Sequence, residues 1–261
     1  MNENTMSKIL PRGSFAEAFL SVFSSLSLVK RYKLYAYFII PFLLNIVILS
    51  LMFYLSVTTL KPLIQNLVTG NGILFDMLRF IITPLLVIIQ MIITIFIYSI
   101  VGNIVTAPFN DFLSQKVEIK AFGEKFDEKL TLKSMIADII RVVANLIKLL
   151  LLMAAAHILL FLLNFIPVLG TVLYTVLGFL VTAFFFGFQF YDYPLERRRY
   201  TFGKKLKTTF RFASQVLGIG VGFFLLSLIP VINFLGLNMA TTAATVMFSN
   251  YIKPVITQNE P

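Results

Sequence analysis

Long stretches without a charged side chain dominate the hydrophobic and polar pattern of this chain. Four such stretches cover residues 34–60, 80–110, 149–191 and 212–252. An α-helix rises 1.5 Å per residue and needs about 20 apolar residues to cross a hydrocarbon core of about 30 Å. The first two stretches each fit one long or tilted span, whereas the last two fit two arms and a turn. The pattern predicts an all-α integral membrane protein with two long transmembrane helices and two helical hairpins.

Composition supports this class. Hydrophobic residues make up 58% of the chain and charged residues 13%, whereas soluble domains carry about 25% charged residues. A transmembrane β-barrel needs strands of alternating polarity, but the four stretches are apolar on all sides. The composition therefore excludes a disordered chain and argues against both a barrel and an ordinary soluble enzyme.

The segments between the stretches complete the organisation of a single membrane domain over residues 1–261. We expect, in chain order, an amphipathic helix with a basic mouth, a first span, a second span, a cytoplasmic amphipathic insert, a first hairpin, a basic loop and a second hairpin. Their boundaries are, respectively, 14–33, 34–60, 73–107, 108–148, 149–191, 192–211 and 212–252.

The first of these segments has apolar residues at steps of three and four, which predicts an amphipathic helix lying at the membrane surface. Serines and Glu17 occupy the opposite face. The predicted apolar face consists of Phe15, Phe19, Val22, Phe23, Leu26 and Val29.

The basic residues indicate the orientation. If each single span crosses once and each hairpin returns to its starting side, 20 of the 22 lysines and arginines share one side, and only Lys61 and Arg79 lie opposite. The positive-inside rule places the basic side in the cytoplasm. The polar start of the chain lacks the pattern of a cleaved secretory signal, so we expect no segment to be removed.

The two hairpins share a turn sequence. Ile-Pro-Val-Leu at residues 166–169 recurs as Ile-Pro-Val-Ile at residues 229–232. Pro167 and Pro230 lack an amide hydrogen and disfavour helix in the residue before them. The first arm of the second hairpin, residues 216–229, would be only about 21 Å long as a helix, which favours a re-entrant rather than a fully crossing hairpin.

Residues that could support catalysis are few. The chain has no cysteine and one histidine, His157, which in its apolar surroundings is expected to be neutral and bonded to another helix. No phosphate-binding G-x-x-x-x-G-K-[ST] motif is present. We therefore expect a protein that is not an enzyme, with no metal, no cofactor and no nucleic-acid partner.

Anion handling is the chemistry that the hairpins favour. A hairpin tip inside the membrane exposes the amide hydrogens and the positive dipole end of its second arm, and such helix ends attract anions. The alternatives are interhelical hydrogen bonds for the amides and interfacial anchoring for the cations. The candidate anion-binding residues are Lys30, Arg31, Lys33, Asn45, Asn103 and Asn110, with the tip residues Pro167, Gly170, Thr171, Pro230, Asn233, Gly236 and Asn238.

A further basic group follows the first hairpin. Arg197, Arg198 and Arg199 stand shortly after Asp192. One interpretation is an aromatic belt with an ion pair and cytoplasmic arginines. The other is a loop that binds anionic lipid.

Four sequences carry a resemblance to a known family. They are Asn-Ile-Val-Thr-Ala-Pro-Phe-Asn at 103–110, Phe-Ile-Pro-Val-Leu-Gly at 165–170, Gln-Phe-Tyr-Asp-Tyr-Pro at 189–194 and Ile-Pro-Val-Ile-Asn-Phe at 229–234. From about Phe15 to Tyr251 the chain resembles the CysZ sulfate permease family, whose domain is shared with eukaryotic etoposide-induced membrane proteins. The resemblance implies an inner-membrane homo-oligomer that admits sulfate for cysteine synthesis, with two long spans and two partly penetrating hairpins.

That family also carries an arginine pair shortly before the proline of the first span, implicated in sulfate binding. The corresponding positions here are Tyr35 and Ala36, and the nearest basic residues are Lys30, Arg31 and Lys33. Two functions follow as hypotheses. The first is a permease for sulfate or a similar small oxyanion, and the alternative is a lipid-binding, membrane-shaping scaffold without transport.

Overall fold

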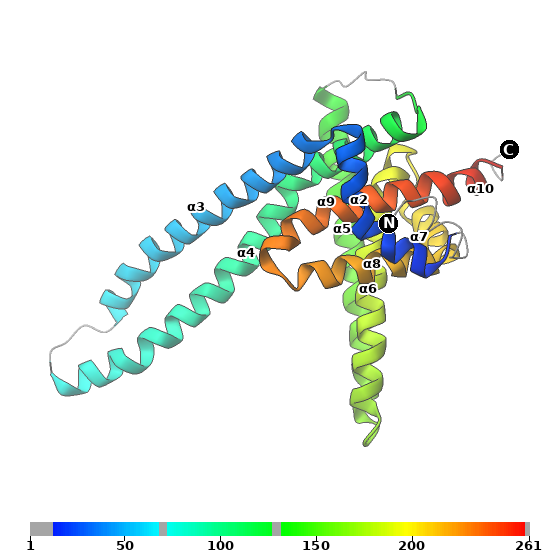
Figure 1. Cartoon of the computed structure of the whole chain (residues 1–261). Helices are drawn as coiled ribbons and strands as arrows, with labels where there is room; N and C mark the ends of the chain where they lie inside the picture. The colour runs from blue at the N-terminus through cyan, green and yellow to red at the C-terminus, as the bar shows by residue number, and fades with distance from the viewer. Residues whose placement is uncertain (1–12, 68–71, 127–131, 259–261) are drawn as a thin grey trace. The chain divides into compact units, whose positions relative to one another are not determined.

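All regular elements in the described part of the protein are helices. The computed structural model describes residues 13–67, 72–126 and 132–258 (Figure 1). Four helices there are long and apolar enough to cross a membrane: Tyr35–Thr59, Asp76–Ile95, Ala144–Phe165 and Gly170–Arg197. A shorter pair, Phe202–Arg211 and Ala213–Ser227, is bent by 91°. It is long and apolar enough only when its two helices are taken together, as a broken span or a re-entrant loop. The expected all-α membrane class is confirmed.

The helices run further than the hydrophobic pattern indicates. One helix continues through Pro108 into the segment expected as an insert, and most of the segment expected as a basic loop, residues 192–211, is also helical. A proline within a helix bends it without having to end it. In order the elements are α2 Phe15–Tyr32, α3 Tyr35–Leu67, α4 Ile73–Phe122, α5 Leu132–Phe161, η1 Leu162–Phe165, α6 Gly170–Arg197, α7 Phe202–Arg211, α8 Ala213–Ser227, α9 Pro230–Met247, η2 Phe248–Ile252 and α10 Lys253–Gln258.

The chain forms two compact units, and the smaller one is Phe38–Phe109. It consists of most of α3 and the first part of α4, which lie side by side as a hairpin (Figure 1). Few polar contacts join the two helices: Thr94 donates to Ser56 at 3.0 Å between hydroxyls, and Tyr98 donates to the Asn45 side-chain oxygen at 3.2 Å. The apolar side chains point outward, with Phe53 and Tyr54 about two thirds exposed. Such a surface is stable only in an apolar surrounding.

In the larger unit, formed by Met1–Tyr37 and Asn110–Pro261, α8 lies between α2 and α6. Glycines on two sides of α8 permit this. A Cβ on Gly218 would lie 2.4 Å from the Phe15 carbonyl oxygen of α2, and one on Gly220 would lie 1.7 Å from the Ala183 carbonyl oxygen of α6. Gly187 of α6 approaches the Val216 carbonyl of α8 in the same way. We call these two contacts the glycine seams; they let helix backbones touch, which is how helices pack closely without a hydrophobic driving force.

The glycine seam decides which face of α2 points inward. Only small or slender residues fit against Gly218 and Gly222, so α2 buries Ala18, Val22, Ser25 and Val29. Its phenylalanines point the other way: Phe15, Phe19 and Phe23 form a ladder of neighbouring rings, and Phe15 and Phe23 are about 40% exposed. The predicted apolar face is therefore divided, with its valines in the core and its aromatic rings on the surface.

The hairpin of α5, η1 and α6 extends away from the other helices of this unit and ends in an apolar tip (Figure 1). Val168 at the tip is 92% exposed. Between the arms, His157 donates from Nδ1 to the Met153 carbonyl at 2.9 Å, because a carbonyl can only accept, and Nε2 then accepts from the Thr182 hydroxyl at 3.1 Å. The prediction that His157 bonds to another helix is confirmed, and this pattern needs only a neutral imidazole.

Replacing Gly220 by alanine is expected to lower the melting temperature of the protein in detergent, measured by circular dichroism. The added Cβ must push α8 away from Ala183, and overpacking of a close-packed site costs about 1–3 kcal/mol. The matched change Gly203→Ala on α7 meets nothing within 4 Å, so it should leave stability unchanged or raise it by up to about 1 kcal/mol. Equal melting temperatures for the two variants would contradict the seam.

Candidate functional site

Charged side chains from four helices meet within the larger unit, in a group that we call the ionic cluster. It contains four acidic and four basic residues, so that its formal charge is zero. They are Asp111 and Glu118 of α4, Arg141 of α5, Asp192, Glu196 and Arg197 of α6, Arg198 directly after α6, and Lys205 of α7.

Lys205 is one of two completely buried charges in the cluster. It lies between two carboxylates of α6, with Nζ 2.5 Å from Asp192 Oδ1 and also in contact with Glu196. Glu196 accepts further hydrogen bonds from Arg141 and, at 3.2 Å, from the side-chain nitrogen of Asn145 on α5. This part of the cluster therefore fixes α7 and the start of α5 against the end of α6.

Glu118 is the other fully buried charge. Its two oxygens accept from Arg197 Nε at 3.1 Å and from Arg198 at 2.9 Å. Arg197 also donates to the carbonyl and the carboxylate of Asp111. Arg198 reaches the Pro194 carbonyl at 2.8 Å and lies over the ring of Phe248. A buried charge is tolerated when it is paired and fully hydrogen-bonded, and both conditions are met here.

A chain of hydroxyl groups continues from the cluster to α9. Arg197 donates to Ser114 Oγ, and Ser114 and Thr245 are 2.8 Å apart at their hydroxyls. Thr245 also contacts the Thr241 carbonyl at 2.7 Å. Each hydroxyl has one proton, so the consistent assignment is that Ser114 donates to Thr245 and Thr245 donates to the Thr241 carbonyl.

The three arginines of the predicted basic loop lie in different surroundings. Arg197 and Arg198 form ion pairs within the ionic cluster. Arg199 is exposed and has a left-handed backbone with φ of 54°. The first two arginines are therefore ion-paired within the protein, with Glu118 rather than with Asp192, and the third presents its charge to the surroundings.

The basic mouth lies at the end of α2. Lys30 and Arg31 are exposed in the last turn, and Lys33 is the left-handed C-cap whose amide donates to the Lys30 carbonyl at 3.4 Å. Lys120 of α4 adds a further cation, donating from Nζ to the Tyr32 carbonyl at 2.9 Å. Cations at a helix C-terminus interact favourably with the helix dipole. The mouth is the place where the structure gathers exposed positive charge among the anion candidates.

The predicted amide donors are mostly occupied. Asn45 donates to the Pro41 carbonyl at 3.0 Å and accepts from Tyr98, so both ends of its side chain are used. Asn110 is 3% exposed and hydrogen-bonds Tyr193, but its Oδ1 has no partner. The side chain of Asn103 lies outside the described residues.

At the first hairpin tip, fewer backbone amides are bare than the sequence led us to expect. The amide of Gly170 donates to the Ile166 carbonyl at 3.0 Å, and that of Leu173 donates to the Leu169 carbonyl at 3.0 Å. Exposed apolar side chains surround them, while Thr171 stays exposed beside the turn. Gly170 is needed for a different reason, since a Cβ there would lie 2.0 Å from the Leu163 carbonyl oxygen.

The second tip is similar. Pro230 is the first residue of α9 and has no amide hydrogen, and the Asn233 amide donates to the Ile229 carbonyl at 2.8 Å. The Asn233 side-chain oxygen is buried without a partner. Gly236 packs on Leu226, and Asn238 is 1% exposed. Among the described side chains of this tip, the Asn233 oxygen is an acceptor without a partner, and it cannot donate a hydrogen bond to an anion.

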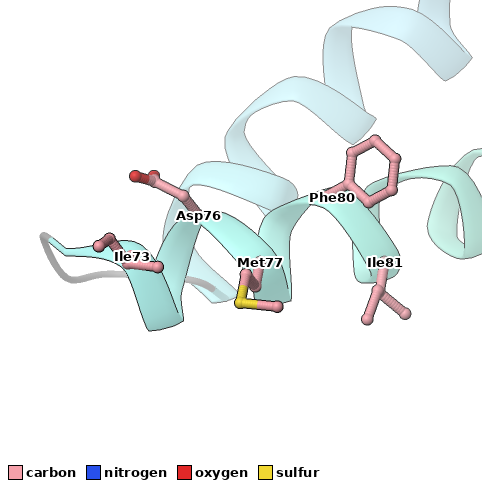
Figure 2. Close-up of a pocket in the computed structure, with 5 residues that line it drawn as sticks. All are labelled: Ile73, Asp76, Met77, Phe80 and Ile81. Atoms are coloured by element: carbon pink, nitrogen blue, oxygen red, sulfur yellow. The ribbon is translucent and has the colours of Figure 1, made fainter.

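One cavity of about 350 Å³ lies in the smaller unit on the first turns of α4 (Figure 2). Ile73, Met77, Phe80 and Ile81 make it apolar, and Asp76 is its one charged side chain. Figure 2 shows the Asp76 carboxylate pointing away from Met77 and Ile81. The described side chains of this cavity are an apolar wall with a carboxylate nearby, a lining that does not attract an anion.

Comparison with known proteins gives a consistent result. Residues 21–237 match the model of the family described as "Sulfate transporter CysZ/Etoposide-induced protein 2.4". A sulfate transporter CysZ of Pectobacterium atrosepticum is 28% identical over 79% of this chain and 75% of its own length. One of Vibrio cholerae is 27% identical over 85% and 88%, and one of Pseudomonas aeruginosa is 26% identical over 85% and 90%.

The chain belongs to the sulfate transporter CysZ/etoposide-induced protein 2.4 family. With its long apolar helices, it is a multi-pass membrane protein. The matched range of this family member contains the whole ionic cluster, the first hairpin tip and the second tip as far as Gly236, whereas Asn238 and Thr245 lie beyond it.

Sequence reasoning singled out Asp192 and the arginines that follow it, but it missed Asp111, Glu118, Glu196 and Lys205. Part of the signal was present, since Asn110, Ser114 and Glu118 recur every four residues and therefore share one face of a helix. That periodicity identifies a polar face but does not identify its partners. Lys205 was hidden among similar neighbours, because Lys204 and Lys207 look the same in sequence and differ only in exposure.

Replacing Lys205 by methionine is expected to destabilise the protein strongly, because Asp192 loses its ion pair with Lys205 and Glu196 keeps only its ion pair with Arg141. Removing one partner of a buried pair costs about 3–5 kcal/mol. The same change at the adjacent, exposed Lys204 should cost less than about 1 kcal/mol. Melting temperatures in detergent test this, and two variants of equal stability would show that the buried pair contributes nothing.

Proposed function

We propose that this protein is a permease for sulfate or a similar small oxyanion in the cytoplasmic (inner) membrane, supplying sulfur assimilation. The observation that carries the proposal is the family match over residues 21–237, together with relatives named sulfate transporters over most of their length. Transport rather than catalysis also fits the apolar, multi-pass chain.

The orientation follows from charge. With the spans and hairpins as above, 20 of 22 basic residues face the cytoplasm, in line with the positive-inside rule. On this arrangement the ionic cluster and α7 lie toward the cytoplasmic side. The apolar tips of the hairpins then reach into the bilayer.

The charges of the protein suit passage rather than tight capture. A conducting site has to bind weakly enough to release its ion, and the ionic cluster, with equal numbers of opposite charges, has no excess charge to trap a dianion. We place anion collection at Lys30, Arg31 and Lys33 instead. These precede Tyr35 and Ala36, the positions that carry the arginine pair in CysZ proteins, by a few residues.

We further propose that several copies assemble and that the anion passes along their contacts. The apolar surface of the α3–α4 hairpin is broad, with none of the strongly apolar window of Asp76–Ile95 buried within the chain. Such a surface contacts either lipid tails or another copy. A homo-oligomer would use part of it for subunit contact and leave the rest to membrane lipids.

Transport is tested with purified protein in liposomes and labelled sulfate outside. We expect uptake above empty vesicles, competed by unlabelled sulfate, with folding confirmed by size-exclusion chromatography of re-extracted protein. Folded protein that gives no uptake, yet deforms the vesicles, would replace the permease with the membrane-shaping scaffold.

The double variant Lys30→Gln/Arg31→Gln should lower sulfate flux severalfold, because each lost cation reduces the local anion concentration near a partly screened mouth. Lys33 is left intact because it caps α2 in a left-handed conformation. The control Lys125→Gln/Lys148→Gln removes two exposed lysines elsewhere and should change flux little. Flux is compared at equal protein and in low and high salt, and equal effects of the two doubles would refute a special role for the mouth.

A further inference from the structure

Helix α7 has a buried polar side and an exposed basic side. Toward the protein it buries Lys205, Thr208 and Thr209, and the threonine hydroxyls bond to carbonyls one turn earlier. Outward it exposes Lys207, Phe210 and Arg211 together, since steps of three and four residues share one side of a helix. Lys205 of this helix thus belongs to the ionic cluster, whereas Lys207 and Arg211 are exposed to the surroundings.

The outward charges Lys207 and Arg211 of α7 lie in a segment of the sequence that is poor in acidic residues. No aspartate or glutamate occurs between Glu196 and Glu260. Glu196 already bonds Lys205 and Arg141. Lys207, Arg211 and the exposed Arg199 at the preceding turn form no ion pair with any side chain in the described part of the chain. The surface formed by Lys207, Phe210 and Arg211, which we call the α7 face, therefore has a formal charge of +2.

Packing places the α7 face where the lipid-exposed hairpin meets the charged interior. Phe202 contacts Phe188 with ring centroids 6.0 Å apart, and Phe210 stacks on Phe184 at 4.7 Å. The two contacts are eight residues apart along α7 but only four residues apart along α6. Helix α7 therefore lies obliquely across α6. The exposed apolar part of α6 ends just before Phe184, about 21 Å from the tip at Gly170.

The exposed ring of Phe210 indicates which class of ligand this surface binds. Its ring is stacked on Phe184 on one side yet remains 59% exposed, between two cations in sequence. A soluble anion gains nothing from an exposed ring. A phospholipid offers both a phosphate for the cations and acyl chains for the ring, as at the interfacial belts of membrane proteins.

We propose that the α7 face binds the headgroups of anionic phospholipids, with Lys207 and Arg211 contacting the phosphates and Phe210 lying at the level of the glycerol and upper acyl chains. Clustered basic residues beside a membrane segment attract acidic lipids. This site does not depend on the proposed transport activity.

A tryptophan reporter tests the site, because the chain contains no tryptophan. Phe210→Trp is reconstituted into vesicles of phosphatidylcholine and phosphatidylglycerol in which either lipid alone carries brominated chains, at the same mole fraction. Bromine quenches only neighbouring indole, so stronger quenching by brominated phosphatidylglycerol is expected. Adding Lys207→Gln and Arg211→Gln should reduce that preference by up to about fivefold for each charge.

Two controls make the outcome decisive. Val168→Trp at the apolar tip should be quenched equally by the two brominated lipids. Native mass spectrometry of delipidated protein without any tryptophan should show more bound phosphatidylglycerol than phosphatidylcholine, and less after Lys207→Gln/Arg211→Gln but not after Lys125→Gln/Lys148→Gln. Equal quenching at position 210 and equal binding would overturn the proposal, as would displacement of the lipid by millimolar free phosphate.

Discussion

The packing of the larger unit depends on the requirement that a charge removed from solvent must meet its opposite. Lys205 and Glu118 are completely buried, and each lies between two partners contributed by neighbouring segments. Moving α4, α5 or α7 along α6 would separate at least one of the ion pairs of the cluster. Apolar packing alone would tolerate sliding of these smooth helices, whereas the paired charges define their register.

The glycine seams complement this requirement where α8 packs against α6 and α2. Charges specify which helices meet, and the seams determine how closely they approach. Gly187 and Gly220 bring the backbones of α6 and α8 into contact, and Gly218 does the same for α2 and α8. A bilayer supplies little force to bring apolar helices together, so contact at this range, where dispersion is strongest, replaces the hydrophobic effect of a soluble core.

Hydrophobic spacing was sufficient to predict the helical class, the break near Pro167 and the interhelical bond of His157, because each follows from local rules. The continuation of α4 beyond Pro108 was not predictable from charge, since a charged residue does not end a helix whose polar face has partners. The outward turn of the α2 phenylalanines also escaped, because it follows from glycines about 200 residues away. Among the candidate site residues, Arg197 and Arg198 could be recognised as a basic group from the sequence. Their ion pairs with Glu118 could not, because that residue lies about 80 positions earlier in the chain.

The threonine hydroxyls of α9 determine which hydrogen bonds this helix can make with its neighbours. Thr241, Thr242 and Thr245 each direct their proton to a carbonyl of their own helix. Each of these hydroxyls can therefore only accept a further hydrogen bond. The buried side of α9 thus presents acceptors to its neighbours, which suits a donor such as Ser114 and would repel a negatively charged group.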